Sequence, residues 1–232
     1  MPPSTDIKQL FASIAKRYEL ANHLLCGGID IWWRFLAAQK VASWGPRDIL
    51  DLATGSGDLA AAIKKNLPSS IITGVDFCGE MLEQAKGKNI DHLLEADALK
   101  LPFTEKNFDA VTVAFGLRNM ESWKDALCEM KRILRNGGHL LILDFSLPSL
   151  PIVRPLYRFY LHNILPHLAG WITGKADAYK YMGASIETFP SGLAMCELLE
   201  QCGFVEARAT PLTLGVVTIY TAKRSLTPMQ VT

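Results

Sequence analysis

A glycine-rich turn framed by carboxylates follows the first strongly apolar segment of this 232-residue chain. The turn contains Gly55, Ser56 and Gly57, and Asp51 precedes it near the end of the apolar segment. A second apolar segment closes with Asp76, 19 residues after Gly57. Glycines in such a turn let the backbone approach a ligand closely, and an acid about 20 residues further on accepts hydrogen bonds from a ribose diol. We therefore predict that this part of the chain binds an adenosine-containing cofactor.

Two cofactors compete for this turn. The segment Gly55–Ala60 fits the dinucleotide pattern G-x-G-x-x-A, which by itself is a weak signal. A pyrophosphate here would face Asp51 and Asp58 without a nearby Lys or Arg, and this disfavours phosphate. S-adenosylmethionine carries an ammonium and a sulfonium, which carboxylates attract, so the pattern favours this methyl donor over a nicotinamide dinucleotide. An ordinary helix-start role would explain Asp58 but not Asp51 or Asp76.

Composition limits the other possibilities. The chain is 49% hydrophobic with a formal net charge of +1, which predicts one domain spanning 1–232 and gives no indication of a nucleic-acid partner. The 5 cysteines form no C-x-x-C pair and lie apart from the histidines, so we expect no metal site. Their odd number is typical of a protein from a reducing compartment. The first residues lack the order of a secretory signal, and no apolar run has the length of a membrane span. We expect a cytoplasmic protein and leave contact with a membrane surface open.

Between residues 48 and 145, short apolar segments alternate with amphipathic ones, as strands and helices do in a doubly wound α/β domain. The apolar segments are nearly continuous, which indicates a parallel sheet buried on both faces, with ligands bound at the carboxyl ends of its strands. The expected strands are 48–52, 70–75, 91–95, 108–115 and 138–145, and the expected helices are 58–66, 79–86 and 122–134. We expect Asn136-Gly137-Gly138 to cap the last helix.

Different patterns flank this alternating region. Helices are expected over 6–25 and 32–43, and they would form an N-terminal helical cap over 1–45. The segment 147–190 is rich in proline and aromatic residues and is interpreted as a helical insertion, either a substrate cover or a helical pair that closes the core. A helix over 188–202 and a β-hairpin of 204–210 and 216–223 follow. A closing hairpin is typical of methyltransferase sheets, whereas a dinucleotide domain would add a sixth parallel strand.

Three motifs resemble one known family. Phe115-Gly116-Leu117-Arg118-Asn119 follows the fourth expected strand, the segment 132–146 forms a second signature, and 18–33 resembles a third less faithfully. These motifs are similar to those of the ubiquinone/menaquinone biosynthesis C-methyltransferases, which methylate the ring of a polyprenylated quinol. The resemblance extends over nearly the whole chain, from about residue 11 to about residue 223.

The chain also departs from this family at several positions. The substituted positions are Glu19 for Asp, Asp30 for His, Ala114 for Ser, Arg135-Asn136 for Lys-Pro and Asp144 for Glu. Most of these changes keep charge or turn character, so they leave the implied fold intact. Those at Asp30 and Ala114 affect the substrate site and one cofactor hydrogen bond.

The resemblance implies a class I S-adenosylmethionine-dependent fold, with a mostly parallel seven-stranded sheet and a C-terminal antiparallel hairpin. It implies S-adenosyl-L-methionine as methyl donor, with Ser56 facing the methionine part and Asp76 holding the ribose hydroxyls. Asp97 and Ala98 would lie against the adenine, the Asp97 carboxylate accepting from the exocyclic amine. Ala114 would contribute through its backbone only. Without the resemblance, Asp97 is equally well interpreted as a loop acid.

Catalysis on a quinol requires a phenolate, because the ionised oxygen pushes electrons onto the ring carbon that is methylated. Arg118 and Asn119 are the predicted catalytic residues: the guanidinium would stabilise the oxyanion or organise a water, and the amide would orient the same oxygen. Arg118 stays protonated, so it is not a direct base. A salt bridge from Arg118 to an acid such as Glu121 is the structural alternative. His162 and His167 are candidate bases that we do not assign.

The implied partner is a polyprenylated quinol, and the sequence leaves open whether its ring is a naphthoquinol or a benzoquinol. The prenyl tail needs an apolar groove or a bilayer, which the N-terminal helix and the segment 147–182 would supply through peripheral membrane contact. Tyr18 and Asn22 would border the entrance. A homodimer stays open. The alternative functions are methylation of another small molecule or, with little basic character to support it, of RNA; a nicotinamide-dependent oxidoreductase; and a non-catalytic scaffold.

Overall fold

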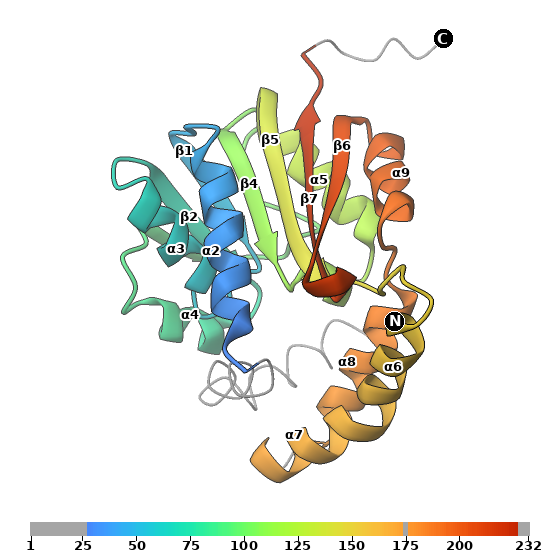
Figure 1. Cartoon of the computed structure of the whole chain (residues 1–232). Coiled ribbons are helices and arrows are strands. Elements are labelled where there is room, and N and C mark those ends of the chain that lie inside the picture. Colours follow the sequence, from blue (N-terminus) through green and yellow to red (C-terminus); the bar gives the residue numbers. More distant parts are fainter. Residues whose placement is uncertain (1–26, 174–175, 227–232) are drawn as a thin grey trace.

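The computed structural model describes residues 27–173 and 176–226, which build one seven-stranded sheet with helices on both faces (Figure 1). The strand order is β3-β2-β1-β4-β5-β7-β6. The strands are β1 (Asp48–Leu52), β2 (Ile71–Asp76), β3 (His92–Glu95), β4 (Phe108–Ala114), β5 (Leu134–Phe145), β6 (Phe204–Leu212) and β7 (Val217–Arg224). The first five are parallel, and β7 pairs antiparallel with β5 and β6. The predicted parallel sheet with a closing hairpin is therefore confirmed.

The central strands are buried because their apolar side chains face helices on both sides of the sheet. Helices α2 (Ile29–Ala42) and α3 (Asp58–Asn66) pack with one apolar cluster, which includes Trp33 and Ile49. Helices α5 (Trp123–Ile133) and α9 (Leu193–Gln201) pack with the other. Helix α4 (Gly79–Ala85) follows β2. Strand β1 lies between β2 and β4, so the chain reverses direction across the sheet there, and the carboxyl ends of these strands form the usual crevice of such folds.

The insertion consists of helices at the carboxyl end of the parallel strands (Figure 1). Its elements are α6 (Val153–Phe159), the π-helical turn η2 (Tyr160–Ile164), α7 (Leu165–Thr173) and α8 (Ala176–Thr188). Leu161, Leu165 and Ile186 are buried and belong to the same apolar cluster as α2. The insertion thus packs on the core and also lies at the edge of the sheet where ligands bind.

The predicted cap between α5 and β5 was wrong. Helix α5 ends at Ile133 and β5 begins at the next residue, so Asn136-Gly137-Gly138 lies within the strand and caps no helix. Strand pairing passes from Phe108–Leu134 to Ala110–His139, and the extra residues of β5 form a bulge in which Gly137 has a φ of 76°.

The predicted helix over 188–202 is also divided. Helix α8 ends at Thr188 and α9 begins at Leu193. Pro190 disfavours helical geometry in the residue before it, and Gly192 has a φ of 61°, so these two residues separate the helices. The predicted helix over 6–25 and the residues Tyr18, Glu19 and Asn22 lie outside the described residues.

Candidate functional site

A cleft opens at the carboxyl ends of β1, β2, β3 and β4, with an empty volume of about 560 Å³ that includes its open mouth. Nearly all its lining residues follow directly from strand ends. They are Leu52, Ala53, Asp76, Phe77, Ala96, Asp97, Ala98, Leu99, Gly116, Asn119, Met120 and Glu121. The cleft therefore has the position and size of a site for a nucleoside-sized ligand.

The glycine turn after β1 has a conformation that favours glycine. Gly55 and Gly57 have φ values of 57° and 83°. A Cβ atom on Gly57 would lie 2.6 Å from Cδ1 of Ile90, so a larger residue would need the neighbouring side chain to move. The Gly55 N–H donates to Oδ2 of Asp76 at 2.8 Å, which ties the turn to the end of β2.

Asp76 is a buried carboxylate at the edge of the cleft, 5% exposed. Its Oδ1 accepts from the Cys78 N–H at 3.0 Å and its Oδ2 from Gly55. Burial raises the pKa of Asp76 above its ordinary value, and these backbone donors oppose the rise. Each carboxylate oxygen has two lone pairs, so both can still accept from a ligand hydroxyl.

Asp51 has a different position from the one expected of a ligand-facing acid. It is 1% exposed and is not among the lining residues. The hydroxyls of Thr54 and Thr112 each donate to it at 2.6 Å. Burial raises the pKa of Asp51 to about 6, although both hydroxyls and the charge of Arg34 lower it. Asp51 thus lies on the side of the glycine turn away from the cleft and stabilises the turn through its hydrogen bond with Thr54.

The backbone is unusual where β1 and β4 end. Ala53 and Phe115, the residues that follow these strands, have φ values of 51° and 58°, which are rare for residues other than glycine. A Cβ atom on Gly116 would lie 2.5 Å from Cβ of Ala53. The two strand ends therefore meet across a residue that must be glycine, and strained backbone of this kind is concentrated at binding sites.

The charges of the cleft fit a cationic nucleoside better than a pyrophosphate. Asp76, Asp97 and Glu121 line it, and no Lys or Arg is among its lining residues in the described part of the chain. The prediction that Asp58 also lacks a nearby cation was wrong. Lys88 forms an ion pair with it, and the Arg34 guanidinium lies 3.8 Å away. The preference for a cation therefore depends on the lining acids, which would hold the adenosine and methionine parts of S-adenosylmethionine.

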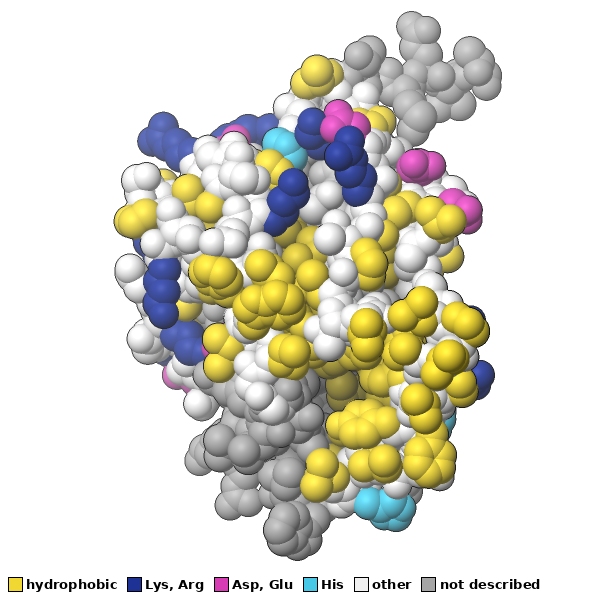
Figure 2. Space-filling view, viewed as in Figure 1, with side chains coloured by type: hydrophobic (Ala, Val, Ile, Leu, Met, Phe, Trp, Pro, Cys, Tyr) yellow, Lys and Arg dark blue, Asp and Glu magenta, His cyan; other side chains and the backbone are white. Residues whose placement is uncertain are grey.

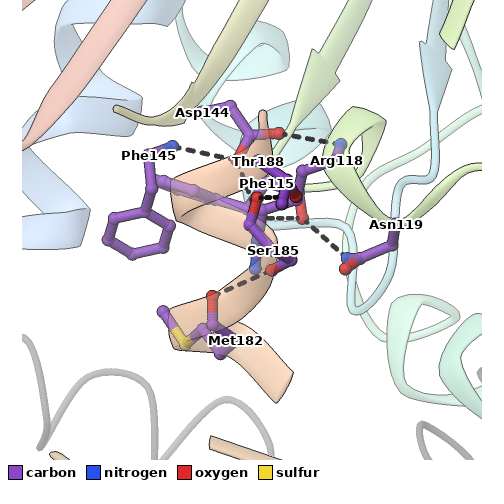
Figure 3. A network of polar contacts seen from close by, with 8 residues as sticks. All are labelled: Phe115, Arg118, Asn119, Asp144, Phe145, Met182, Ser185 and Thr188. Carbon is purple, nitrogen blue, oxygen red and sulfur yellow. Dashed lines mark hydrogen bonds and ion pairs between the residues drawn. The ribbon is translucent and has the colours of Figure 1, made fainter. Parts of the chain in front are cut away.

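Arg118 and Asn119 lie on the short 3₁₀ turn η1 (Leu117–Asn119), which Phe115 and Gly116 connect to the end of β4 (Figure 3). The Arg118 guanidinium is 2.7 Å from Oδ1 of Asp144 and 2.6 Å from the Phe115 carbonyl oxygen. The guanidinium also lies over the Phe145 ring, 5.3 Å from its centroid. The predicted alternative of a salt bridge does exist, but its partner is Asp144 at the end of β5 rather than Glu121.

Four of the ten predicted site residues line the cleft: Asp76, Asp97, Ala98 and Asn119. The other six, which do not line it, are Asp51, Gly55, Ser56, Gly57, Ala114 and Arg118. Ser56 is 8% exposed, and its hydroxyl contacts Asp58 at 3.3 Å.

Sequence reasoning missed several apolar walls of the cleft, chiefly Ala53, Phe77 and Met120. Phe77 follows Asp76, and Met120 follows the FGLRN motif. Both could have been found by extending each strand-end motif by one residue.

The sheet order and the closing hairpin together define the α/β fold of the S-adenosylmethionine-dependent methyltransferases. Solved structures support the fold. A methyltransferase of Thermotoga maritima matches with a TM-score of 0.63 and 16% identity over 94% of this chain and 99% of its own. Human N-acetylserotonin methyltransferase, solved in complex with SAM, matches with a TM-score of 0.63 and 18% identity over 93% of this chain and 58% of its own.

Sequence comparison identifies the family. The model of the ubiE/COQ5 methyltransferase family matches residues 3–224, so this chain belongs to that family. The demethylmenaquinone methyltransferase of Thermus thermophilus is 41% identical over 221 residues, which are 93% of this chain and all of the relative. A ubiquinone/menaquinone biosynthesis C-methyltransferase of Syntrophotalea carbinolica is 41% identical over 229 residues, 97% of this chain and 96% of the relative. The chain is thus a methyltransferase whose methyl donor is S-adenosylmethionine.

The Asp51→Asn variant tests whether Asp51 is buried with a raised pKa beneath the glycine turn. Because the pKa of Asp51 rises from 3.8 to about 6, the folded protein holds this proton more tightly than the unfolded chain does. Its contribution to stability is therefore lost as pH rises from about 4 to about 6. We expect the free energy of unfolding of Asp51→Asn, relative to the parent, to increase by roughly 2 kcal/mol between about pH 4.5 and about pH 8.

Denaturant titration at each pH measures this difference. Asp125→Asn replaces an exposed acid in the first turn of α5 and is the matched control. If the free energies of unfolding of Asp51→Asn and the parent changed equally with pH, the burial of Asp51 would be contradicted.

Proposed function

We propose that this protein methylates a ring carbon of a polyprenylated quinol, converting a demethylmenaquinol to a menaquinol. The observation that carries the proposal is the acid-lined cleft next to the FGLRN turn, with an apolar insertion at the same edge of the sheet. The relatives at about 40% identity are named for the same reaction class. The acceptor must be in its reduced form, because only the quinol has an electron-rich ring.

The lining acids would hold the methyl donor at its polar groups. Asp76 accepts from the ribose hydroxyls, and Asp97 and Ala98 border the adenine, with the Asp97 carboxylate accepting from its exocyclic amine. When bound, S-adenosylmethionine supplies an electrophilic methyl group on a sulfonium. Ser56 and the backbone of Gly55 and Gly57 would face the methionine part.

On the acceptor side, the Asn119 amide contacts the ring oxygen and favours its ionised form. The ring carbon then forms a bond to the methyl group while the carbon–sulfur bond breaks, and S-adenosylhomocysteine is the leaving group. The proton on that ring carbon passes to a water molecule, which restores the aromatic phenolate. Arg118 acts through Asn119: both donate to the Phe115 carbonyl oxygen, at 2.6 and 3.3 Å, which fixes the turn in place. Arg118 is therefore a positioning residue in this proposal.

Product analysis with a labelled methyl donor tests the reaction. We expect a labelled product with a demethylnaphthoquinol carrying a prenyl tail and much less with a benzoquinol, each kept reduced with dithionite. Mass spectrometry locates the label on a ring carbon. Binding of NAD but not of S-adenosylmethionine in a calorimeter, or label on oxygen, would contradict the proposal.

Variants of the FGLRN turn separate contact from positioning. Asn119→Ala should lower kcat by about 10²-fold, as loss of one oxyanion donor does elsewhere, with the Kd of S-adenosylmethionine within about twofold of the parent. Arg118→Lys should lower kcat by about 10-fold, because the ammonium keeps the charge beside Asp144 but not the geometry of the guanidinium. Steady-state kinetics measure both. Full activity in Arg118→Lys and Asn119→Ala would eliminate this assignment.

We further propose that the insertion rests on a membrane surface while the prenyl tail is taken up. Ile152, Leu156 and Phe159 are 76, 66 and 59% exposed and lie one helical turn apart in sequence, and Ile164 and Leu168 follow. These residues are named the insertion face. Figure 2 shows hydrophobic side chains gathered over this part of the molecule and over α2. Among the described residues, no helix is both long and apolar enough to cross a bilayer.

The charges near the insertion face favour a lipid surface over a protein partner. Residues 150–173 contain two arginines and two histidines and no acid. Glu187 of α8 pairs with Arg158 and His162 and offsets part of this positive charge. An apolar helix face whose own segment carries basic residues and no acid is the pattern that binds anionic lipid headgroups. The tail of the substrate needs the same apolar surroundings, so one surface would serve both.

Vesicle sedimentation tests this surface. The protein should pellet with vesicles of phosphatidylglycerol, less with phosphatidylcholine, and less again at high salt. Phe159→Ser should reduce the pelleted fraction several-fold because it removes exposed apolar area. Leu193→Ser, at a leucine on α9 that is even more exposed than Phe159, is the control and should pellet like the parent. Full recovery in the supernatant, or a lipid-independent dimer that Phe159→Ser abolishes, would contradict membrane contact.

A further inference from the structure

Helix α8 packs against η2 with one face and against η1 with another. Gly183 lies against η2, since a Cβ atom there would be 3.3 Å from the carbonyl oxygen of Leu161. Tyr181 and Ser185 are four residues apart and share another face of the helix. Helix α8 packs against η1, and Figure 3 shows Ser185 beside the residues of that turn. Ser185 is only 7% exposed, so this face of α8 is the one that closes over η1.

Tyr181 is half-buried on this face, one turn before Ser185. The Arg118 charge acts on its phenol and favours the ionised form, but burial raises the pKa of Tyr181 above its ordinary value and is the larger effect. The side chain is therefore a neutral hydroxyl at neutral pH and can donate a hydrogen bond.

We propose that the Tyr181 hydroxyl donates a hydrogen bond to a ring oxygen of the acceptor, which makes Tyr181 a second catalytic residue beside Asn119. The inference deepens the proposed quinol methylation and rests on it. A hydrogen bond to a developing phenolate is stronger than one to a neutral hydroxyl, so this contact favours the transition state over the ground state. The acceptor would then be recognised from two sides, by η1 at the sheet and by α8 of the insertion.

The Tyr181→Phe variant removes only this hydroxyl. We expect kcat to fall by about 10- to 100-fold, as for loss of one donor to an oxyanion, with the Kd of S-adenosylmethionine unchanged within about twofold. The pH at which kcat reaches half its maximum should move upward, because the quinol would ionise with less help. A merely structural role would lower the melting temperature and leave this pH profile in place, so both are measured.

Tyr157→Phe, on α6 of the same insertion, is the matched control and should leave kcat and the pH profile unchanged. A parent enzyme that methylates the quinol together with a Tyr181→Phe variant of equal kcat and pH profile would overturn the role of Tyr181. A parent enzyme that methylates no quinol would overturn the proposed function itself, and the two failures are thereby distinguished. Equal losses in Tyr181→Phe and Tyr157→Phe would also count against a specific contact.

Discussion

The ion pair between Arg118 and Asp144 joins the ends of two strands in the interior of the protein, where their side chains are 5 and 0% exposed. Burial raises the pKa of Asp144 and the Arg118 charge opposes it. Removal of either partner would leave a buried charge unpaired, at a typical cost of about 3 to 5 kcal/mol. Because Arg118 also holds the Phe115 carbonyl, the pair fixes the turn that carries Asn119. The geometry of the acceptor side therefore depends on one contact far from solvent.

Three carboxylates near the first two strands show how burial divides similar residues into different tasks. Asp76 lies at the cleft with its oxygens partly occupied by backbone donors, so it stays available to a ligand. Asp51 is held by two threonine hydroxyls behind the turn and serves structure. Asp58 is neutralised by Lys88 and Arg34 and so contributes less negative potential to the site. Only the first of the three is positioned to bind the donor directly.

Much of the fold could be predicted because local patterns decide it. The bounds of β1 and α3 match the predicted ones, since an apolar segment, a glycine turn and an amphipathic segment follow one another without interruption. Asn136-Gly137-Gly138 was misread because a pair of glycines after a helix is a local capping signal, whereas the bulge in β5 depends on pairing with β4. Similarly, the sequence placed the acids of the cleft but not the partners of Asp58 and Arg118. Those partners lie 24 to 30 residues away and meet them only through the fold.

The same distinction separates the two halves of the site. The donor half consists of strand ends and backbone, and its residues lie within short motifs that the sequence displays. The proposed acceptor half combines η1 with α8. Their closest residues are more than 50 positions apart in the sequence, and only packing brings Ser185 and Arg118 together. Carbon methylation needs the ring, the methyl group and the proton acceptor aligned in the absence of bulk water. A rigid sheet edge can hold the methyl donor. The acceptor also has a long apolar tail, so the element that covers its ring must offer an apolar outer surface for that tail. The insertion meets both needs, because its buried face closes over η1 and its exposed face carries the hydrophobic residues.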